Sequence, residues 1–149
     1  MIDELDSKII RFLQKDGRMA YSQIARELNI SEPTVRGRVQ RLIQDGVIQI
    51  IAMGDPIKLG FNLAGNLKVQ VDYKKLDSVL EELERIDEIW YIAIMTGAND
   101  LDIEFIAKSM EDLRALIFRV NNIDGIVRTE SSLIMSMEKE RYDWGTAIG

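Results

Sequence analysis

The chain has 149 residues, 46% of them hydrophobic and 30% charged, which predicts a globular protein with one large or two small domains. It contains no cysteine and no histidine, which excludes disulfides, zinc–thiolate sites, thiol catalysis and the commonest general base. The net charge is −6, but residues 1–50 hold 8 Lys+Arg against 7 Asp+Glu, so the acidity lies beyond them and indicates two modules with different partners.

Two helices are predicted at the N-terminus. The first spans residues 3–15, where apolar side chains recur at helical spacing, and Asp16-Gly17 ends it. Ser22 is expected to cap the second helix. Asn29 follows that helix, and we expect it to form a tight turn because asparagine tolerates the left-handed conformation.

A third helix and a strand are predicted next. Ser31 is expected to cap the helix, with Pro33 in its first turn, where a missing N–H does little harm. Asp45-Gly46 closes the helix, and the apolar segment 47–53 then predicts a strand. Three short helices followed by such a strand are typical of a winged helix-turn-helix unit, which places its last helix in the DNA major groove.

The pattern changes beyond residue 61, where strands and helices alternate in the order β-α-β-β-α-β. This order is typical of a ferredoxin-like sandwich, in which two helices cover one face of a four-stranded antiparallel sheet. The expected strands are 63–73, 89–95, 100–107 and 126–138, and the expected helices are 75–86 and 109–123.

The fold class is therefore predicted to be α+β, with two domains joined by a linker that is rich in glycine and proline. The predicted parts are a winged helix-turn-helix domain at 1–53, a linker at 54–61, a ferredoxin-like domain at 62–141 and a tail at 142–149.

The third helix has one apolar and one exposed face on a wheel of about 100° per residue. Its core face is expected to hold Val35, Val39, Leu42 and Ile43. The expected DNA-contacting residues are those of the opposite face and its flanks, together with the cap and the start of the second helix: Tyr21, Ser22, Ser31, Pro33, Thr34, Arg36, Gly37, Arg38, Gln40 and Arg41.

These side chains are expected to contact different parts of the DNA. Arg36 and Arg38 lie on the two flanks and are expected to reach phosphates. Thr34, Gln40 and Arg41 are better placed for base edges, since arginine suits guanine and glutamine suits adenine. The alternative is that arginines on an exposed helix face are simply solvated.

Gly37 is unusual because a glycine inside a helix costs about 1 kcal/mol relative to alanine. It falls near the middle of the exposed face, where a missing side chain lets the backbone approach DNA closely. The alternative is that an exposed glycine is merely tolerated at this position.

The segments "LDSKIIRFLQKDGRMAYSQIARELNISEPTVRGRVQRLIQDGVI" and "TGANDLDIEF" together resemble the Lrp/AsnC family of transcriptional regulators. The resemblance covers essentially the whole chain, and Asn29 stands where the family often has glycine. It implies double-stranded DNA as a partner and assembly into dimers, octamers or hetero-oligomers with paralogues. It also implies a small effector, often an amino acid, and no other cofactor.

The resemblance places the effector site at the loop that carries the T-G-x-x-D motif. Carried over by motif, the effector-binding residues are Thr96, Gly97, Asn99 and Asp100. A loop glycine exposes backbone N–H groups for a carboxylate, and an aspartate can hold an ammonium. The same residue types also fit an ordinary hairpin turn.

A polar sheet face is predicted on the side that, in this family, packs against a partner subunit. Asp102 and Glu104 project from one strand, and Lys68 and Gln70 are expected to point the same way from the neighbouring strand. Lys68 could therefore pair with either carboxylate, and such charges can influence partner choice. A simply solvated face is the alternative.

No catalytic or metal site is predicted. Asp100, Asp102 and Glu104 alternate along a strand without the spacing of a calcium loop, and no phosphate loop or nucleophile elbow occurs. There is also no signal peptide and no apolar run of about 18 residues, so a soluble, cytoplasmic protein without a membrane partner is expected.

The sequence predicts a sequence-specific transcriptional regulator rather than an enzyme. One alternative is an oligomeric architectural protein that organises DNA with weak sequence preference and a steep salt dependence. Another is a protein-interaction module with a vestigial DNA domain, which the exposed Arg36, Arg38 and Arg41 argue against.

Overall fold

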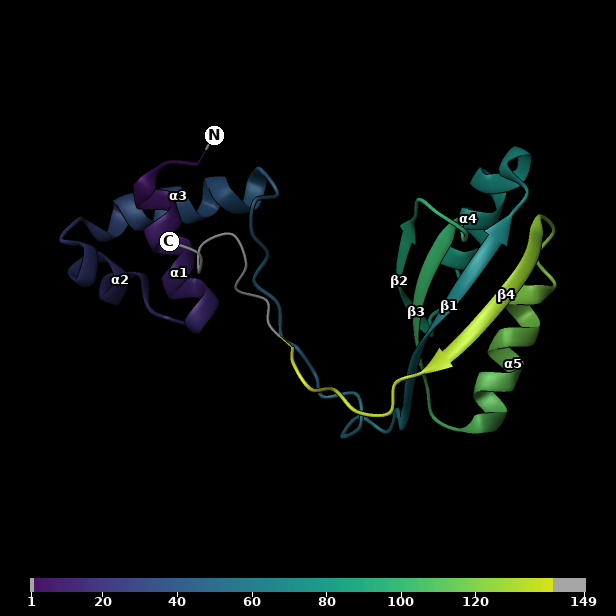
Figure 1. Cartoon of the computed structure of the whole chain (residues 1–149). Coiled ribbons are helices and arrows are strands. Elements are labelled where there is room, and N and C mark those ends of the chain that lie inside the picture. The colour runs from purple at the N-terminus through teal and green to yellow at the C-terminus, as the bar shows by residue number, and fades with distance from the viewer. Residues whose placement is uncertain (1, 141–149) are drawn as a thin grey trace. The chain divides into compact units, whose positions relative to one another are not determined.

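The computed structural model describes residues 2–140 of the chain. The described chain divides into two compact units, one formed mainly by residues 2–53 and one by residues 54–137 (Figure 1). Each unit has a hydrophobic core of its own. Residue 141 and the expected tail, 142–149, lie outside the described residues. None of the helices within residues 2–140 is long and apolar enough to cross a membrane.

The N-terminal unit is built from three helices, as predicted: α1 (Glu4–Lys15), α2 (Tyr21–Leu28) and α3 (Glu32–Gln44). They pack around one small core because each helix places its apolar side chains on a single face. The buried core residues are Ile9, Leu13, Ile24, Ala25, Val35 and Val39. Ala25 lets α2 and α3 approach each other closely because its side chain is small.

The turn between α2 and α3 confirms two local predictions. Asn29 has φ 53° and ψ 48°, the left-handed conformation that asparagine tolerates. The Ser31 hydroxyl accepts a hydrogen bond from the backbone N–H of Thr34 and caps α3. The prediction for Ser22 is wrong, because α2 begins at Tyr21 and its N-cap is Ala20, whose side chain cannot accept a hydrogen bond.

Two further predictions for this unit are wrong. Within the described chain, Val47–Met53 forms no strand, so the helix-turn-helix lacks the expected wing. An apolar sequence can favour an extended backbone, but a strand also requires a neighbour to complete its hydrogen-bond ladder. Ile43 was expected in the core and is 44% exposed, because the core side of α3 ends at Leu42.

The C-terminal unit is a four-stranded antiparallel sheet with helices on one face, which confirms the α+β ferredoxin-like fold (Figure 1). The strand order is β2-β3-β1-β4. The elements are β1 (Leu63–Val71), the short 3-10 helix η1 (Tyr73–Lys75), α4 (Leu76–Glu84), β2 (Ile89–Ile94), β3 (Leu101–Ala107), α5 (Met110–Asn121) and β4 (Ile126–Leu133).

The alternation of side chains along the two central strands determines which face of the sheet is covered. Leu67 and Val69 of β1, and Ile103 and Phe105 of β3, are fully buried under the helices. The residues between them in sequence project from the opposite face. We call this opposite side the open face of the sheet, because no helix of the C-terminal unit packs on it (Figure 1).

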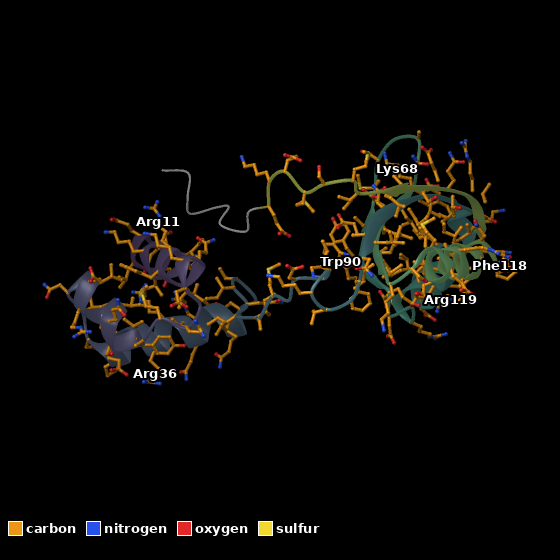
Figure 2. The ribbon with its side chains drawn as sticks, turned by 90° about the horizontal axis from the view of Figure 1, so that it is seen from below. Arg11, Arg36, Lys68, Trp90, Phe118 and Arg119 are labelled. Atoms are coloured by element: carbon orange, nitrogen blue, oxygen red, sulfur yellow. The ribbon has the colours of Figure 1, made fainter. Side chains whose placement is uncertain are left out.

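A bulge at Trp90 changes the composition of the open face. Ile89 pairs with Phe105 and Tyr91 pairs with Glu104, so Trp90 is the extra residue in β2. The Trp90 and Tyr91 ring centroids are 6.0 Å apart, and Trp90 is 60% exposed. Figure 2 shows Trp90 on the other side of the sheet from α5, which carries Phe118 and Arg119.

Candidate DNA-binding and effector sites

The exposed face of α3 has open space at its centre. A Cβ atom added to Gly37 would meet no atom of residues 2–140 within 4 Å, so the described part of the fold does not require a glycine there. Pro33, Thr34 and Gln40 are also exposed on α3. The local fold therefore tolerates a side chain at Gly37, and packing within this unit does not explain the glycine.

Arg36 is held at the edge of this face by two contacts. Its guanidinium donates to the carboxylate of Glu32 at 2.6 Å, one helical turn earlier. The same group lies over the ring of Tyr21, 5.4 Å from the centroid. Arg11 of α1 and Arg36 of α3 project from opposite sides of the helical unit (Figure 2). Arg36 is thus held by two neighbours, while its side chain is still more than half exposed.

The hydroxyl groups at the start of α3 are partly engaged with each other. Ser31 Oγ and Thr34 Oγ1 are 2.7 Å apart, within hydrogen-bonding distance. The exposed hydroxyl of Thr34 keeps the capacity for a further hydrogen bond, because a hydroxyl can donate one and accept two. Tyr21 is half-buried and Ser22 exposed at the start of α2, where both remain predicted phosphate contacts.

Arg38 and Arg41 are engaged by α1, an arrangement that the sequence analysis missed. Arg38 forms ion pairs with Asp3 and with Asp6, the latter at 3.1 Å. Arg41 pairs with the other carboxylate oxygen of Asp6 at 2.5 Å. Asp6 is completely buried, and a buried carboxylate needs such partners to remain charged. No periodic pattern indicates these pairs, because their members lie 32 to 35 residues apart.

Asp3 and Asp6 also cap α1 reciprocally. The backbone N–H of Asp6 donates to the side chain of Asp3 at 2.8 Å, and the backbone N–H of Asp3 donates to Asp6 at 3.1 Å. Hydrogen bonds from Arg38 and from the Asp6 N–H lower the pKa of Asp3 from 3.8 to about 2. Burial raises the pKa of Asp6, but the Asp3 N–H and the two arginines outweigh it and leave that pKa lowered. Both carboxyls are therefore ionised at neutral pH.

The predicted effector loop lies between β2 and β3 and is tied to the end of β1. The Asp100 carboxylate accepts a hydrogen bond from the backbone N–H of Val71 at 2.8 Å, and its own N–H donates to the carbonyl of Val69 at 2.8 Å. The Gln70 side chain donates to the carbonyl of Ala98 at 2.7 Å. The negative charge of Asp100, together with burial and a hydrogen bond to Asp100, raises the pKa of Tyr73.

The loop leaves its central residues open. Thr96 and Gly97 are exposed, Asn99 and Asp100 are half-buried, and Gly97 has φ +114°, a conformation that favours glycine. The loop is thus a hairpin connection, as the simpler interpretation predicted, and it also presents unobstructed backbone at Gly97. Asp100 has a structural role whether or not it binds a ligand.

The open face carries the predicted charges, but Lys68 makes none of the ion pairs found among residues 2–140. Lys68 lies directly between Asp102 of β3 and Glu130 of β4 in the strand register. Burial, and then the charge of Asp102, raise the pKa of Glu104. The predicted pairing of these two strands as neighbours is therefore confirmed, while Lys68 forms no ion pair with Asp102 or Glu104 of its own chain.

Both units match known domains. Residues 2–43 match the AsnC-type helix-turn-helix domain, and residues 67–144 match the Lrp/AsnC ligand-binding domain. The chain belongs to the Lrp/AsnC family of transcriptional regulators. It is thus a DNA-binding regulator with a ligand-binding domain, and its relatives are regulators rather than enzymes.

Relatives resemble the chain over nearly its full length. An uncharacterised HTH-type transcriptional regulator of Pyrococcus horikoshii is 39% identical over 98% of this chain and 91% of its own. The HTH-type transcriptional regulator FL11 of Pyrococcus furiosus is 30% identical over 94% of this chain and 93% of its own.

Solved structures share the fold of both units. E. coli AsnC has a TM-score of 0.87 and 28% identity, covering 95% of this chain and 97% of its own. A Neisseria meningitidis transcriptional regulator, solved as a complex with L-Met, also has a TM-score of 0.87, covering 95% and 94%. At 18% identity, that second likeness shows the fold alone.

Gly37→Ala separates a structural from a functional reason for the glycine. Because the added methyl group meets open space, we expect the free energy of unfolding to rise by about 1 kcal/mol, the difference in helix propensity. We also expect DNA binding to weaken, because the methyl group would stand between the α3 backbone and the duplex. Urea unfolding and fluorescence anisotropy measure the two effects. A stabilised variant with unchanged DNA affinity would mean that the glycine is merely tolerated.

Proposed function

We propose that the protein is a sequence-specific regulator that reads DNA with the exposed face of α3. The observation that carries this proposal is the clear surface around Gly37, beside an exposed Arg36 side chain that contacts Glu32 and Tyr21. Gln40 and Thr34 offer hydrogen-bonding groups for base edges on the same face, and Arg36 offers a charge for phosphate. The predicted cytoplasmic location follows from this role at DNA.

Arg38 and Arg41 are proposed to contribute to the same surface, although both are also engaged by carboxylates of α1. Both guanidiniums have further N–H donors beyond those that face Asp3 and Asp6. Arg41→Ala is a poor test of base recognition, because it also removes a partner from the buried Asp6 carboxylate. Arg36 gives a cleaner test, because its ion-pair partner Glu32 lies on the surface of the same helix.

Selection of bound sequences from a random duplex pool, followed by anisotropy over a salt series, tests the proposal. We expect an enriched site, and we expect Arg36→Ala to weaken binding and to reduce the salt slope by roughly 1, as for the loss of one phosphate contact. Arg11→Ala is the matched control, because Arg11 projects from the opposite side of the unit (Figure 2). Equal losses for the two variants would contradict the assigned surface. Binding without enrichment would support the architectural alternative instead.

We propose an amino acid as the effector, bound at the loop between β2 and β3. The open backbone at Gly97 suits a carboxylate, and Asp100 has lone pairs left for an ammonium after binding the Val71 N–H. The shared fold of the Neisseria regulator, which was solved with L-Met, supports the choice of ligand class. Thr96 and Asn99 are proposed to complete the site with their side-chain polar groups.

Calorimetric titration of the full chain with a panel of amino acids tests the effector proposal. For an amino acid that binds, we expect Asp100→Asn to weaken affinity by about tenfold or more, the usual effect of losing a charge-assisted hydrogen bond. Asparagine at this position can still accept from the Val71 N–H. Asp72→Asn is the control, since it removes one exposed charge at the end of the neighbouring strand. Binding of no amino acid would refute the ligand class.

We propose that the open face of the sheet meets a second subunit and that its charges help to select the partner. Lys68 stands between Asp102 and Glu130 without an ion pair to any residue that the structure describes, and Glu104 lies beside Tyr91 on the same face. A lysine from a second copy or a paralogue could neutralise these carboxylates. Dimers, octamers and hetero-oligomers are all compatible with such a face.

Lys68→Glu tests this role. It would place a further carboxylate among Asp102, Glu104 and Glu130, so we expect self-association to weaken or a different partner to be preferred. Analytical ultracentrifugation and mixing with differently tagged paralogues measure the two outcomes. Lys74→Glu, which makes the same charge change on the exposed η1, is the control. A Lys68→Glu protein that assembles like the parent would disprove the proposal.

A further inference from the structure

The first turn of α1 and the exposed side of α3 meet through two carboxylates that differ in accessibility. Asp6 is fully buried, whereas the side chain of Asp3 is 54% exposed. Arg38 contacts both, and its own side chain is 28% exposed. One guanidinium is therefore shared between a carboxylate that DNA cannot reach and a carboxylate at the surface.

The two carboxylates have different consequences for a guanidinium that is to bind phosphate. Asp6 holds Arg38 in place through an ion pair of 3.1 Å, and the Asp6 carboxylate in this pair is fully buried. Asp3 accepts from the same guanidinium nitrogen, Nη1, and its half-exposed carboxylate adds a negative charge next to Arg38 at the surface. A DNA phosphate approaching Arg38 would have to displace Asp3 or share the guanidinium with it.

We propose that Asp3 limits the DNA affinity of the protein by competing with backbone phosphate for Arg38, while Asp6 holds Arg38 in place. This inference rests on the proposed function, in which the exposed side of α3 faces DNA. Asp3 acts on the interface through Arg38 and is thus a positioning residue rather than a direct contact. Since Asp3 is ionised throughout the neutral range, the competition persists at every pH at which DNA binding is ordinarily measured.

The expected size of the effect is modest and measurable. Exposed ion pairs are individually weak, so releasing Arg38 from Asp3 should change DNA affinity by about two- to fivefold. A newly completed phosphate contact adds about 0.9 to the slope of log affinity against log salt concentration. The slope is decisive, because a merely structural effect on helix packing would not raise the number of neutralised phosphates.

Asp3→Asn in the full chain is the test, measured by anisotropy on the duplex selected by the parent. Asparagine is as good an N-cap as aspartate, so α1 keeps its cap and circular dichroism should show an unchanged fold. We expect binding about two- to fivefold tighter and a salt slope steeper by about 0.9. Glu4→Gln is the matched control, because Glu4 is exposed in the same turn but pairs with Lys8.

A double-mutant comparison links the effect to Arg38. Arg38→Gln removes a charged partner of the buried Asp6, but its amide N–H groups can still donate to that carboxylate, and circular dichroism checks that the fold is kept. This variant should weaken binding and make the salt slope shallower, and Asp3→Asn should then have no further effect in that background. Unchanged or weaker binding by folded Asp3→Asn protein overturns the inference, as does an equal gain from Glu4→Gln. If the parent binds no duplex, the proposed function fails as well. If the parent binds and only the Asp3 prediction fails, the proposed function stands.

Discussion

The carboxylate of Asp6 is the charge around which the N-terminal unit is organised. It is fully buried, and both of its oxygens receive arginines from α3. Leaving a buried charge without a partner costs several kcal/mol, so α1 and α3 cannot slide or rotate freely against each other. The apolar contacts of the small core hold the helices together but do not fix their relative orientation. The ion pairs of Asp6 fix the orientation of α3 relative to α1. The orientation of the exposed face of α3 therefore depends on a residue that never reaches the surface.

The C-terminal unit follows a different constraint, the alternation of side chains in its central strands. β1 and β3 bury every second residue under α4 and α5, which commits the remaining residues to the open face. Helices of the same unit cover one side of the sheet. The open face carries the aromatic pair Trp90–Tyr91 together with charged side chains. A shift of one residue in register would exchange these two sides, so the core and the proposed assembly surface are specified together.

Local chemistry made much of this fold predictable from the sequence. Apolar periodicity located the helices and strands, Ser31 was correctly expected to cap α3, and Asn29 was correctly expected at the tight turn. These features depend on residues within one or two turns of each other. The position of Gly37 on an exposed helix face was predictable for the same reason.

Features that depend on distant parts of the chain were not predictable. The ion pairs of Arg38 and Arg41 join segments more than 30 residues apart, so a helical wheel shows only that both side chains lie toward the surface. The expected strand at Val47–Met53 failed because apolar composition cannot supply a neighbouring strand. The ligand and DNA contacts remain predictions, since motif residues such as Asp100 also have structural roles.

The attachment of the β2–β3 loop to β1 has a mechanical consequence. The loop is fastened to β1 through Val69, Gln70 and Val71, and β1 is hydrogen-bonded on both sides, to β3 and to β4. A molecule that pulled the Asp100 carboxylate aside would therefore strain one of the two central strands of the sheet and not the hairpin loop alone. The whole sheet would therefore resist a displacement of the loop. Any movement of the loop that did occur would be transmitted along the full length of β1.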